Sequence, residues 1–383
     1  MRLFDTRTRE RVEVGAGPTV GLYVCGITPY DSAHLGHAFV YTVFDALVRY
    51  LEHQGRRVRY ARNVTDVDDD ILRKAAELDT DYLELGRREV ARFDRDLDGL
   101  GLRRPDVVPL ATETVPAIVD AVRTLIERGN AYALPDGRVY FDVATAPAFG
   151  ALSRLTQERM LAQFAEKGGD PDAPGKRQRL DFLLWQPSAG GEPGWPGPVD
   201  GPGPGRPGWH IECSVMALRE LGPVVGVHGG GDDLIFPHHE AEIVQSEHLT
   251  GRAPFARIWM HAGLVSLGGT KMSKSLGNLV FLSDLLERYE GAAVRRYLLS
   301  HHYREGWEFD DAALADAAVG LKRWRGAAGA EGQRPDLELA FHQALADDLD
   351  TPGALAALDE AAAAGAGETV RTLADVLGFA LPG

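Results

Sequence analysis

The beginning of the chain alternates between short apolar runs and a longer segment with helical spacing. Residues 19–25 (TVGLYVC) are almost all apolar, as expected of a buried strand, and the turn-rich segment GITPYDSAHLGH follows them. Residues 38–53 then place apolar side chains at the spacing of one helix face, which predicts an amphipathic helix. A second apolar run and a polar loop come next, in VRYARNVTDVDDD. Strand, loop, helix and strand make a βαβ unit, so about the first 70 residues predict half of a parallel α/β sheet.

The middle of the chain changes to long helices and then to a region rich in glycine and proline. Residues 82–130 have helical spacing that ends at a Gly-Asn pair, and residues 131–142 predict short strands. Residues 186–208 are mostly Gly and Pro, which predicts a loop or linker without regular structure. We expect this part of the chain to be an insertion of about 100 residues in the sheet domain.

Alternating strands and helices return after this region. The alternation continues through WHIECSVMALREL, PVVGVHGGG, a helix from about His238, and ARIWMHAGLV. After Asn278 the remainder is helical and rich in alanine. The fold class predicted is α/β, with one parallel sheet, an insertion and a C-terminal helical bundle. The expected parts are 1–95 and 206–280 as the two halves of the catalytic domain, 96–205 as the insertion, and 281–383 as the helical domain.

Composition narrows the class of protein without identifying it. Apolar residues make up 44% of the 383 residues and charged residues 25%, which excludes a disordered, collagen-like or coiled-coil chain. The net charge of −15 argues against a protein that mainly coats phosphate backbones, although a local basic patch is sufficient to bind nucleic acid. Two cysteines cannot make a disulfide scaffold, and MRLFDTRTRE contains no signal-peptide core. We therefore expect a soluble, cytoplasmic protein with no membrane partner.

Two separated motifs carry the strongest chemical signal. HLGH (residues 34–37) falls at the turn from the first strand to the first helix, and KMSKS (271–275) lies far downstream. A helix N-terminus offers free amide donors to anions, Gly36 permits close backbone approach, and two imidazoles beside it can donate to phosphoryl oxygens. The two lysines can neutralise charge on a triphosphate. Each motif alone also fits a solvated surface loop, but the two together predict an ATP site. Its predicted residues are His34, Gly36, His37, Lys271, Ser273 and Lys274, and the two histidines and two lysines are the predicted catalytic groups.

Five segments in one order resemble the class I aminoacyl-tRNA synthetases, and among these the cysteinyl branch. They are YVCGITPYDSAHLGHA, NVTDVDD, GWHIECS, HGGGDDLIFPHHEAE and KMSKSLGN, and the resemblance extends to about residue 352. It implies a Rossmann-like catalytic domain that activates an amino acid with ATP. Mg²⁺ is expected to accompany the ATP, because a polyphosphate needs a hard counter-cation.

A second group of residues concerns a metal. Cys25 ends the first strand, Cys213 starts a helix after the glycine- and proline-rich region, and His238 and Glu242 lie four positions apart on one helix face. Spacing alone fits two buried core cysteines equally well. The resemblance to cysteinyl synthetases implies one Zn²⁺ per chain, held by Cys25, Cys213, His238 and Glu242.

A zinc ion would have a physical purpose in such an enzyme. Cysteine and serine differ by sulfur for oxygen, and a pocket that reads shape alone separates near-isosteres by only about 10–200-fold. Zinc binds a thiolate strongly and a neutral hydroxyl poorly, so it can select cysteine without an editing site. By resemblance, the cysteinyl group is held by Cys25, Thr28, Thr65, Trp209 and Asp233.

The sequence is compatible with two classes of acceptor for the activated cysteine. Cysteinyl-tRNA synthetases esterify a tRNA 3′ end, whereas the mycothiol ligases form an amide with the amine of glucosaminyl-inositol. CGITPYD, GGDPDAPGK and LDFLLWQPSAGGEPGWPGP resemble the ligases, and the acidic, alanine-rich tail after residue 352 is short for an anticodon-reading domain. HGGGDDLIFPHHEAEIVQSE and NVTDVDDDIL resemble the tRNA enzymes instead. We expect a ligase for glucosaminyl-inositol, with tRNA or another amine as the alternative acceptor.

Two further points bear on these alternatives. Asp70 stands where the tRNA-charging enzymes commonly have lysine, so its role is left open. A catalytically idle paralogue that binds cysteine or adenylate as a sensor is a third interpretation. It is disfavoured because a pure binding module has no need for both histidines and both lysines of the two motifs.

Overall fold

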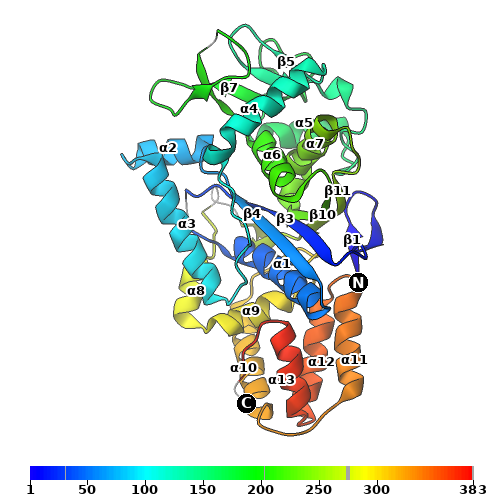
Figure 1. The fold of residues 1–383 in the computed structure, drawn as a ribbon. Helices are drawn as coiled ribbons and strands as arrows, with labels where there is room; N and C mark the ends of the chain where they lie inside the picture. Colours follow the sequence, from blue (N-terminus) through cyan, green and yellow to red (C-terminus); the bar gives the residue numbers. More distant parts are fainter. Residues whose placement is uncertain (31, 202, 273–276, 382–383) are drawn as a thin grey trace.

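The computed structural model describes residues 1–30, 32–201, 203–272 and 277–381, and a parallel four-stranded sheet lies at its centre (Figure 1). The strand order is β11-β10-β3-β4, and each neighbouring pair is parallel. The predicted parallel sheet and its βαβ unit are therefore confirmed. The strands are β3 (Thr19–Ile27), β4 (Arg57–Val64), β10 (Val225–Gly231) and β11 (Ala256–Ala262).

Helices cover both faces of this sheet, because successive side chains of a strand point to opposite faces. Leu22 of β3 packs in the core that contains the buried face of α1 (Leu35–His53). Cys25 of the same strand lies in the opposite core, with buried residues of α6 (Trp209–Leu221) and α7 (Glu240–Thr250). Strand parity thus directs the Cys25 side chain toward α6 and α7.

Between β4 and α6, a region that includes the predicted insertion at 96–205, the chain forms helices and an antiparallel sheet that lies above the central sheet in Figure 1. The strand order of this second sheet is β5-β6-β7-β9-β8. The elements of this region are α2 (Asp69–Glu77), α3 (Tyr82–Gly99), α4 (Ala111–Glu127), β5 (Ala131–Ala133), β6 (Val139–Phe141), α5 (Gln157–Glu166), β7 (Phe182–Pro187), β8 (Trp195–Pro196) and β9 (Pro204–Pro207).

The prediction that residues 186–208 contain no regular structure is wrong. β9 pairs with both β7 and β8 within this region. A Cβ atom on Gly205 would lie 2.4 Å from Nε1 of Trp185, so the close approach of the two strands requires glycine there. Pro204 and Pro207 occupy the two ends of β9, where a residue without an N–H is tolerated best. The glycine and proline content of this region predicted a loop, because composition does not show which positions pair with a neighbouring strand.

The prediction of a helical region after Asn278 is confirmed, with a two-residue strand as the exception. Helices α10 to α13 form a bundle below the sheet in Figure 1. Arg295 of α9 joins this bundle to the catalytic domain, because it pairs with buried Asp45 of α1 and donates through Nε to the Leu377 carbonyl oxygen, 2.7 Å away. The elements are α8 (Leu282–Arg288), α9 (Gly291–Leu299), β14 (Trp307–Glu308), α10 (Asp311–Ala327), α11 (Pro335–Ala346), α12 (Thr351–Ala363) and α13 (Gly367–Val376).

The remaining strands form two small sheets. The N-terminal hairpin consists of β1 (Arg2–Asp5) and β2 (Glu10–Glu13). β12 (Val265–Leu267) pairs with β13 (Thr270–Lys271) and with β14. In the described part of the chain no helix is long and apolar enough to cross a lipid bilayer.

Candidate active site

The predicted site residues meet at the carboxyl ends of the sheet strands, where ligands bind in open parallel sheets. The loops after β3, β4, β10 and β11 converge there on a cavity of about 670 Å³, with the end of α5 and the start of α6 along its wall. The predicted residues that line it are Cys25, Thr28, His34, Gly36, His37, Trp209, Asp233 and Lys271.

The two histidines of the first motif lie at the N-terminus of α1. His34 is the N-cap residue, and its Nδ1 accepts a hydrogen bond from the Gly36 amide at 3.1 Å. The rings of His34 and His37 stack with their centroids 3.8 Å apart. A Cβ on Gly36 would come within 3.0 Å of the His34 ring, so a side chain there would displace it. The motif therefore presents two imidazoles beside a helix N-terminus, whose free amides and dipole favour a phosphate.

The second motif is described only in part. Lys271 ends β13, and its Nζ lies 3.5 Å from Oδ2 of Asp233 on the cavity wall. Ser273 and Lys274 lie outside the described residues. Lys167, which the sequence did not indicate, follows α5 and bonds through its Nζ to the Asp233 carbonyl oxygen. Burial lowers the pKa of Lys167. The insertion therefore brings another cation to the cavity, where anionic phosphates would lie.

Four of the five residues predicted to hold cysteine line the cavity, and Thr65 does not. The Thr65 side chain is buried, and its hydroxyl accepts a hydrogen bond from Asn63 Nδ2 at 3.2 Å. Its amide donates to the Ile27 carbonyl oxygen at 3.0 Å, which joins the ends of β3 and β4. Trp209 stacks on His238 with ring centroids 4.1 Å apart. This stack places the predicted cysteine pocket directly beside the predicted metal ligands.

The four predicted metal ligands form one buried cluster. One ligand atom from each of Cys25, Cys213, His238 and Glu242 lies within 4.8 Å of all the others. Oε1 of Glu242 is 3.4 Å from the Cys25 sulfur and 3.2 Å from Nε2 of His238. Cys213 lies inside α6, in its second turn, rather than at the start of the helix as predicted. The helix begins earlier because Gly208 adopts an extended N-cap conformation just before Trp209.

A second set of ligand atoms overlaps the first. His228 and His239, together with Cys25 and Glu242, also lie within 4.8 Å of one another. The sequence did not assign either histidine a ligand role, although both belong to the HGGGDDLIFPHHEAE segment.

His239 is the centre of a chain of hydrogen bonds behind the cluster. Its Nε2 lies 3.3 Å from the Cys25 sulfur, and its Nδ1 lies 2.7 Å from Nε2 of His261. His261 Nδ1 in turn lies 2.7 Å from the Thr6 hydroxyl. A ring fixed at both nitrogens is typical of the supporting residues that orient metal ligands. The geometry therefore favours the predicted set, with His239 behind it.

The buried cluster fits a cation. Burial raises the pKa of the Cys25 thiol and of the Glu242 carboxyl, and lowers the pKa of His238, so each group is neutral in the absence of a positive charge. His238 Nε2 and Glu242 Oε2 make no aligned hydrogen bond with any described residue. Two sulfurs, one imidazole nitrogen and one carboxylate oxygen form a donor set that suits Zn²⁺.

Two acidic residues near the cavity had no assigned role. Asp70 lines the cavity and pairs with Arg73 of α2 at 2.8 Å. Glu212, beside Cys213 in α6, is fully buried, and neither of its oxygens has a hydrogen-bond partner among the described residues. Burial raises the pKa of Glu212, with the charge of Asp68 as the next cause. The α2 side of the cavity is therefore acidic.

Comparisons with known proteins agree with this geometry. The family described as tRNA synthetases class I (C) catalytic domain matches residues 12–319. A protein of Streptosporangium roseum is 47% identical over 94% of this chain and 88% of its own length. One of Thermobispora bispora is 46% identical over 100% of this chain and 96% of its own length. Both are named L-cysteine:1D-myo-inositol 2-amino-2-deoxy-alpha-D-glucopyranoside ligase.

Solved structures share the fold at low sequence identity. Mycobacterium tuberculosis methionyl-tRNA synthetase in complex with methionyl-adenylate superposes with a TM-score of 0.67 at 17% identity, covering 94% of this chain and 89% of that one. A LeuRS of Agrobacterium radiobacter in a ternary complex gives 0.61 at 13% identity, covering 95% and 83%. These two similarities confirm the predicted class I fold.

Proposed function

The chain belongs to the family of class I (C) tRNA synthetase catalytic domains, and from this premise we propose that it is an ATP-dependent, AMP-forming ligase that joins cysteine to the amine of glucosaminyl-inositol. The curated relatives that cover nearly the whole chain are named for this reaction. They favour the amine over tRNA as the acceptor.

The position of Cys25 carries the proposal. Cys25 lines the cavity that contains the two histidines at the α1 N-terminus, and it also belongs to the buried cluster with Cys213, His238 and Glu242. An amino acid whose sulfur lies near that cluster would present its carboxylate to a nucleotide bound in the same cavity. When bound at this cluster, Zn²⁺ would supply a Lewis acid that prefers a thiolate to a hydroxyl.

The first step forms cysteinyl-adenylate. A carboxylate oxygen of cysteine attacks the α-phosphorus of Mg²⁺-bound ATP, and the bond from that phosphorus to the pyrophosphate oxygen breaks. His34 and His37 bind phosphoryl oxygens at the α1 N-terminus. Lys271 stabilises the charge that develops on pyrophosphate, together with Lys274 of the same motif. The Asp233 carboxylate binds the cysteine ammonium group, and Trp209 closes the pocket beside the sulfur.

The second step transfers the cysteinyl group. The amine nitrogen of the acceptor attacks the acyl carbon, the bond from that carbon to the phosphate oxygen breaks, and AMP leaves. An amide results, with the cysteine sulfur and amine unchanged. This chemistry needs an acceptor amine beside the acyl carbon and a group that takes its proton.

A competition between acceptors tests the proposal. Purified, zinc-replete protein is given labelled cysteine, ATP, glucosaminyl-inositol and transcribed cysteine tRNA together. We expect labelled amide and AMP, with no labelled tRNA. Charged tRNA without amide would assign the chain to tRNA charging, and the absence of cysteine-dependent ATP–pyrophosphate exchange would favour the sensor interpretation. Serine in place of cysteine, under the same conditions, is the control for selection by the metal.

A further inference from the structure

A second cavity opens beside the first one, under the antiparallel sheet of the insertion. It has a volume of about 320 Å³, in the range of small-molecule sites, which is roughly 300–1,000 Å³. The two cavities are adjacent, because five residues line both of them. These shared residues are Asp68, Asp69, Lys167, Gly168 and Trp209.

The wall of the second cavity contains both polar and apolar side chains. Gln186 and Arg206 contribute polar groups from β7 and β9, and Lys176 contributes one from the loop before β7. Phe164 and Phe182 supply apolar surface. Hydroxyl-bearing rings have polar edges and apolar faces, so a wall of this kind suits a polyol of sugar type.

Several of the charged groups around the cavity have close partners. Arg206 pairs with Asp69 and with Glu192, the latter at 3.1 Å, which joins the insertion to the start of α2. The fully buried Asp181 accepts from the Tyr132 hydroxyl at 2.7 Å and from two backbone amides. These contacts hold the lining side chains of the cavity in place.

Asp68 differs from Asp181 in its position, because it lines both cavities. It stands just before α2, where the two cavities meet, and its Oδ2 accepts a hydrogen bond from the Thr28 hydroxyl at 3.2 Å. None of the ion pairs among described residues neutralises it. Burial raises the pKa of Asp68 to about 6, and the neighbouring charges of Asp69 and Asp70 act in the same direction. A carboxylate of this kind can bind an ammonium group and accept a proton near neutral pH.

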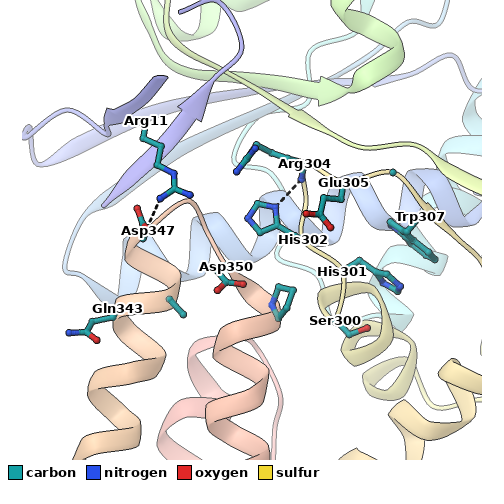
Figure 2. A pocket seen from close by; sticks show the side chains of 13 residues that line it. Arg11, Ser300, His301, His302, Arg304, Glu305, Trp307, Gln343, Asp347 and Asp350 are labelled. Atoms are coloured by element: carbon teal, nitrogen blue, oxygen red, sulfur yellow. Dashed lines mark hydrogen bonds and ion pairs between the residues drawn. The ribbon is translucent and has the colours of Figure 1, made fainter. Parts of the chain in front are cut away.

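Another large cavity lies elsewhere and cannot serve the same step. This cavity has a volume of about 650 Å³. Figure 2 shows its lining residues, among which Arg11 of the N-terminal hairpin reaches Asp347 at the end of α11. This cavity shares no lining residue with the first cavity, of about 670 Å³, which is called the nucleotide cavity below. A nucleophile bound there would not be adjacent to the acyl carbon, so the cavity beside Asp68 is the better acceptor site.

We propose that the second cavity is the acceptor subsite, with the acceptor amine at Asp68 and the rest of the aminosugar glycoside against Lys176 and Gln186. The inference rests on the proposed function, because it assumes an amine acceptor. We place the amine at Asp68 because this carboxylate lines both cavities and so adjoins the nucleotide cavity. The second ring of the acceptor then extends toward the insertion.

The step at Asp68 balances as follows. The acceptor ammonium gives one proton to the Asp68 carboxylate, which passes it to water. The nitrogen lone pair forms the C–N bond to the acyl carbon, and the C–O bond of the anhydride breaks, with its electron pair leaving on AMP. The nitrogen then gives a second proton to Asp68, and the amide remains.

A comparison of whole and truncated acceptors tests the far end of the subsite. Gln186→Leu is expected to raise the KM for glucosaminyl-inositol about tenfold, the effect of losing one or two hydrogen bonds. The same change should alter the KM for glucosamine, which lacks the cyclitol, by less than about twofold, because the lost group faces the missing ring. Lys176→Met is the second variant. Arg159→Ala, an exposed position on α5 outside the cavity, is the matched control and should change neither constant.

Asp68→Asn tests the near end. Amide formation should fall by at least about 100-fold, as expected on losing a proton acceptor, and by far more than ATP–pyrophosphate exchange, which needs no acceptor amine. Equal losses for glucosamine and glucosaminyl-inositol are expected, because both carry the amine. Unchanged acceptor KM in both Gln186→Leu and Lys176→Met, with active wild-type ligase, would overturn the subsite. Wild-type protein that makes no amide would instead overturn the proposed function.

Discussion

Nζ of Lys271 lies 3.5 Å from Oδ2 of Asp233, so the lysine expected to bind pyrophosphate contacts the carboxylate expected to bind the cysteine ammonium group. The two substrates would each replace one half of this pair. Binding of cysteine at Asp233 would therefore release Lys271 to interact with the nucleotide. This exchange of partners would link the two halves of the proposed adenylation site.

Removing either partner should have a distinct kinetic effect. Asp233→Asn is expected to raise the KM for cysteine about tenfold or more, because the ammonium group loses its charged partner. Lys271→Ala should instead lower the maximum rate of ATP–pyrophosphate exchange by about 100-fold or more, since it removes a charge that acts in the transition state. Exchange kinetics with varied cysteine measure both constants.

Asp316→Asn, an exposed position on α10, is the control for these variants. An unchanged cysteine KM in Asp233→Asn would remove that residue from the amino-acid site.

Removing one of the four predicted metal ligands should lower both the zinc content and the selectivity for cysteine over serine. Cys213→Ala should lower the zinc content of purified protein well below one ion per chain, because a buried site with three ligands holds the ion more weakly. The preference for cysteine over serine in exchange should fall with it. Elemental analysis and exchange with the two amino acids measure these outcomes.

Ser214→Ala, on the next residue of the same helix, removes a buried hydroxyl without removing a ligand and should keep the metal. A full complement of zinc in Cys213→Ala would refute the ligand assignment.

Removing Arg295, which joins the catalytic domain to the C-terminal bundle, should cause a large loss of stability. Arg295 and Asp45 are almost completely buried, and Arg295→Met would leave the carboxylate with only part of its compensation, from Arg49 at 2.8 Å. Breaking such a buried pair lowers the free energy of unfolding by about 3–5 kcal/mol. We expect a value near the lower limit, because Arg49 still pairs with Asp45. Urea unfolding measures the change, with exposed Arg323→Met as the control. Equal stability of the two variants would contradict a structural role for the pair.

Asp68 should lower stability at neutral pH, as functional carboxylates often do. Its pKa of about 6 in the folded chain exceeds the ordinary value of about 3.9 in the unfolded chain. The folded state thus binds the proton more tightly, so stability falls as the pH rises from about 4 through 6. Asp68→Asn is expected to be more stable by about 1–2 kcal/mol above pH 6, and this gain should vanish as the pH falls toward 4.

Urea unfolding of Asp68→Asn and wild type at a series of pH values measures this difference, and Asp316→Asn serves as the control. A gain that is independent of pH would show that the Asp68 carboxyl is not the cause.

Local patterns predicted most of the fold because each depends on neighbours in the chain. The apolar run of β3 and the periodicity of α1 are properties of short segments, and so is the turn between them that makes His34 an N-cap. The resemblance of five motifs then indicated the four metal ligands. The structure brings these together because Cys25 faces α6 and α7 by strand parity.

Contacts between distant segments were not predictable in this way. His228 and His239 lie near Cys25 and Glu242 only because β10 pairs with β3 and α7 shares a buried core with Cys25. Lys167 reaches Asp233 from the insertion, and no local pattern marks it as different from other lysines. Thr65 was expected in the cysteine pocket, but its position at the end of β4 places its side chain beside Asn63.

Amino-acid order predicted the parallel sheet and the two ATP motifs from residue type and short spacing, and it predicted the class I family and the metal ligands by resemblance. It could not reveal that β9 is a strand, that Asp68 stands between two cavities, or that Lys271 contacts Asp233. Those relationships were decided by the folded chain, because burial, cavity shape and pairing across hundreds of residues arise only when separate segments exclude water together.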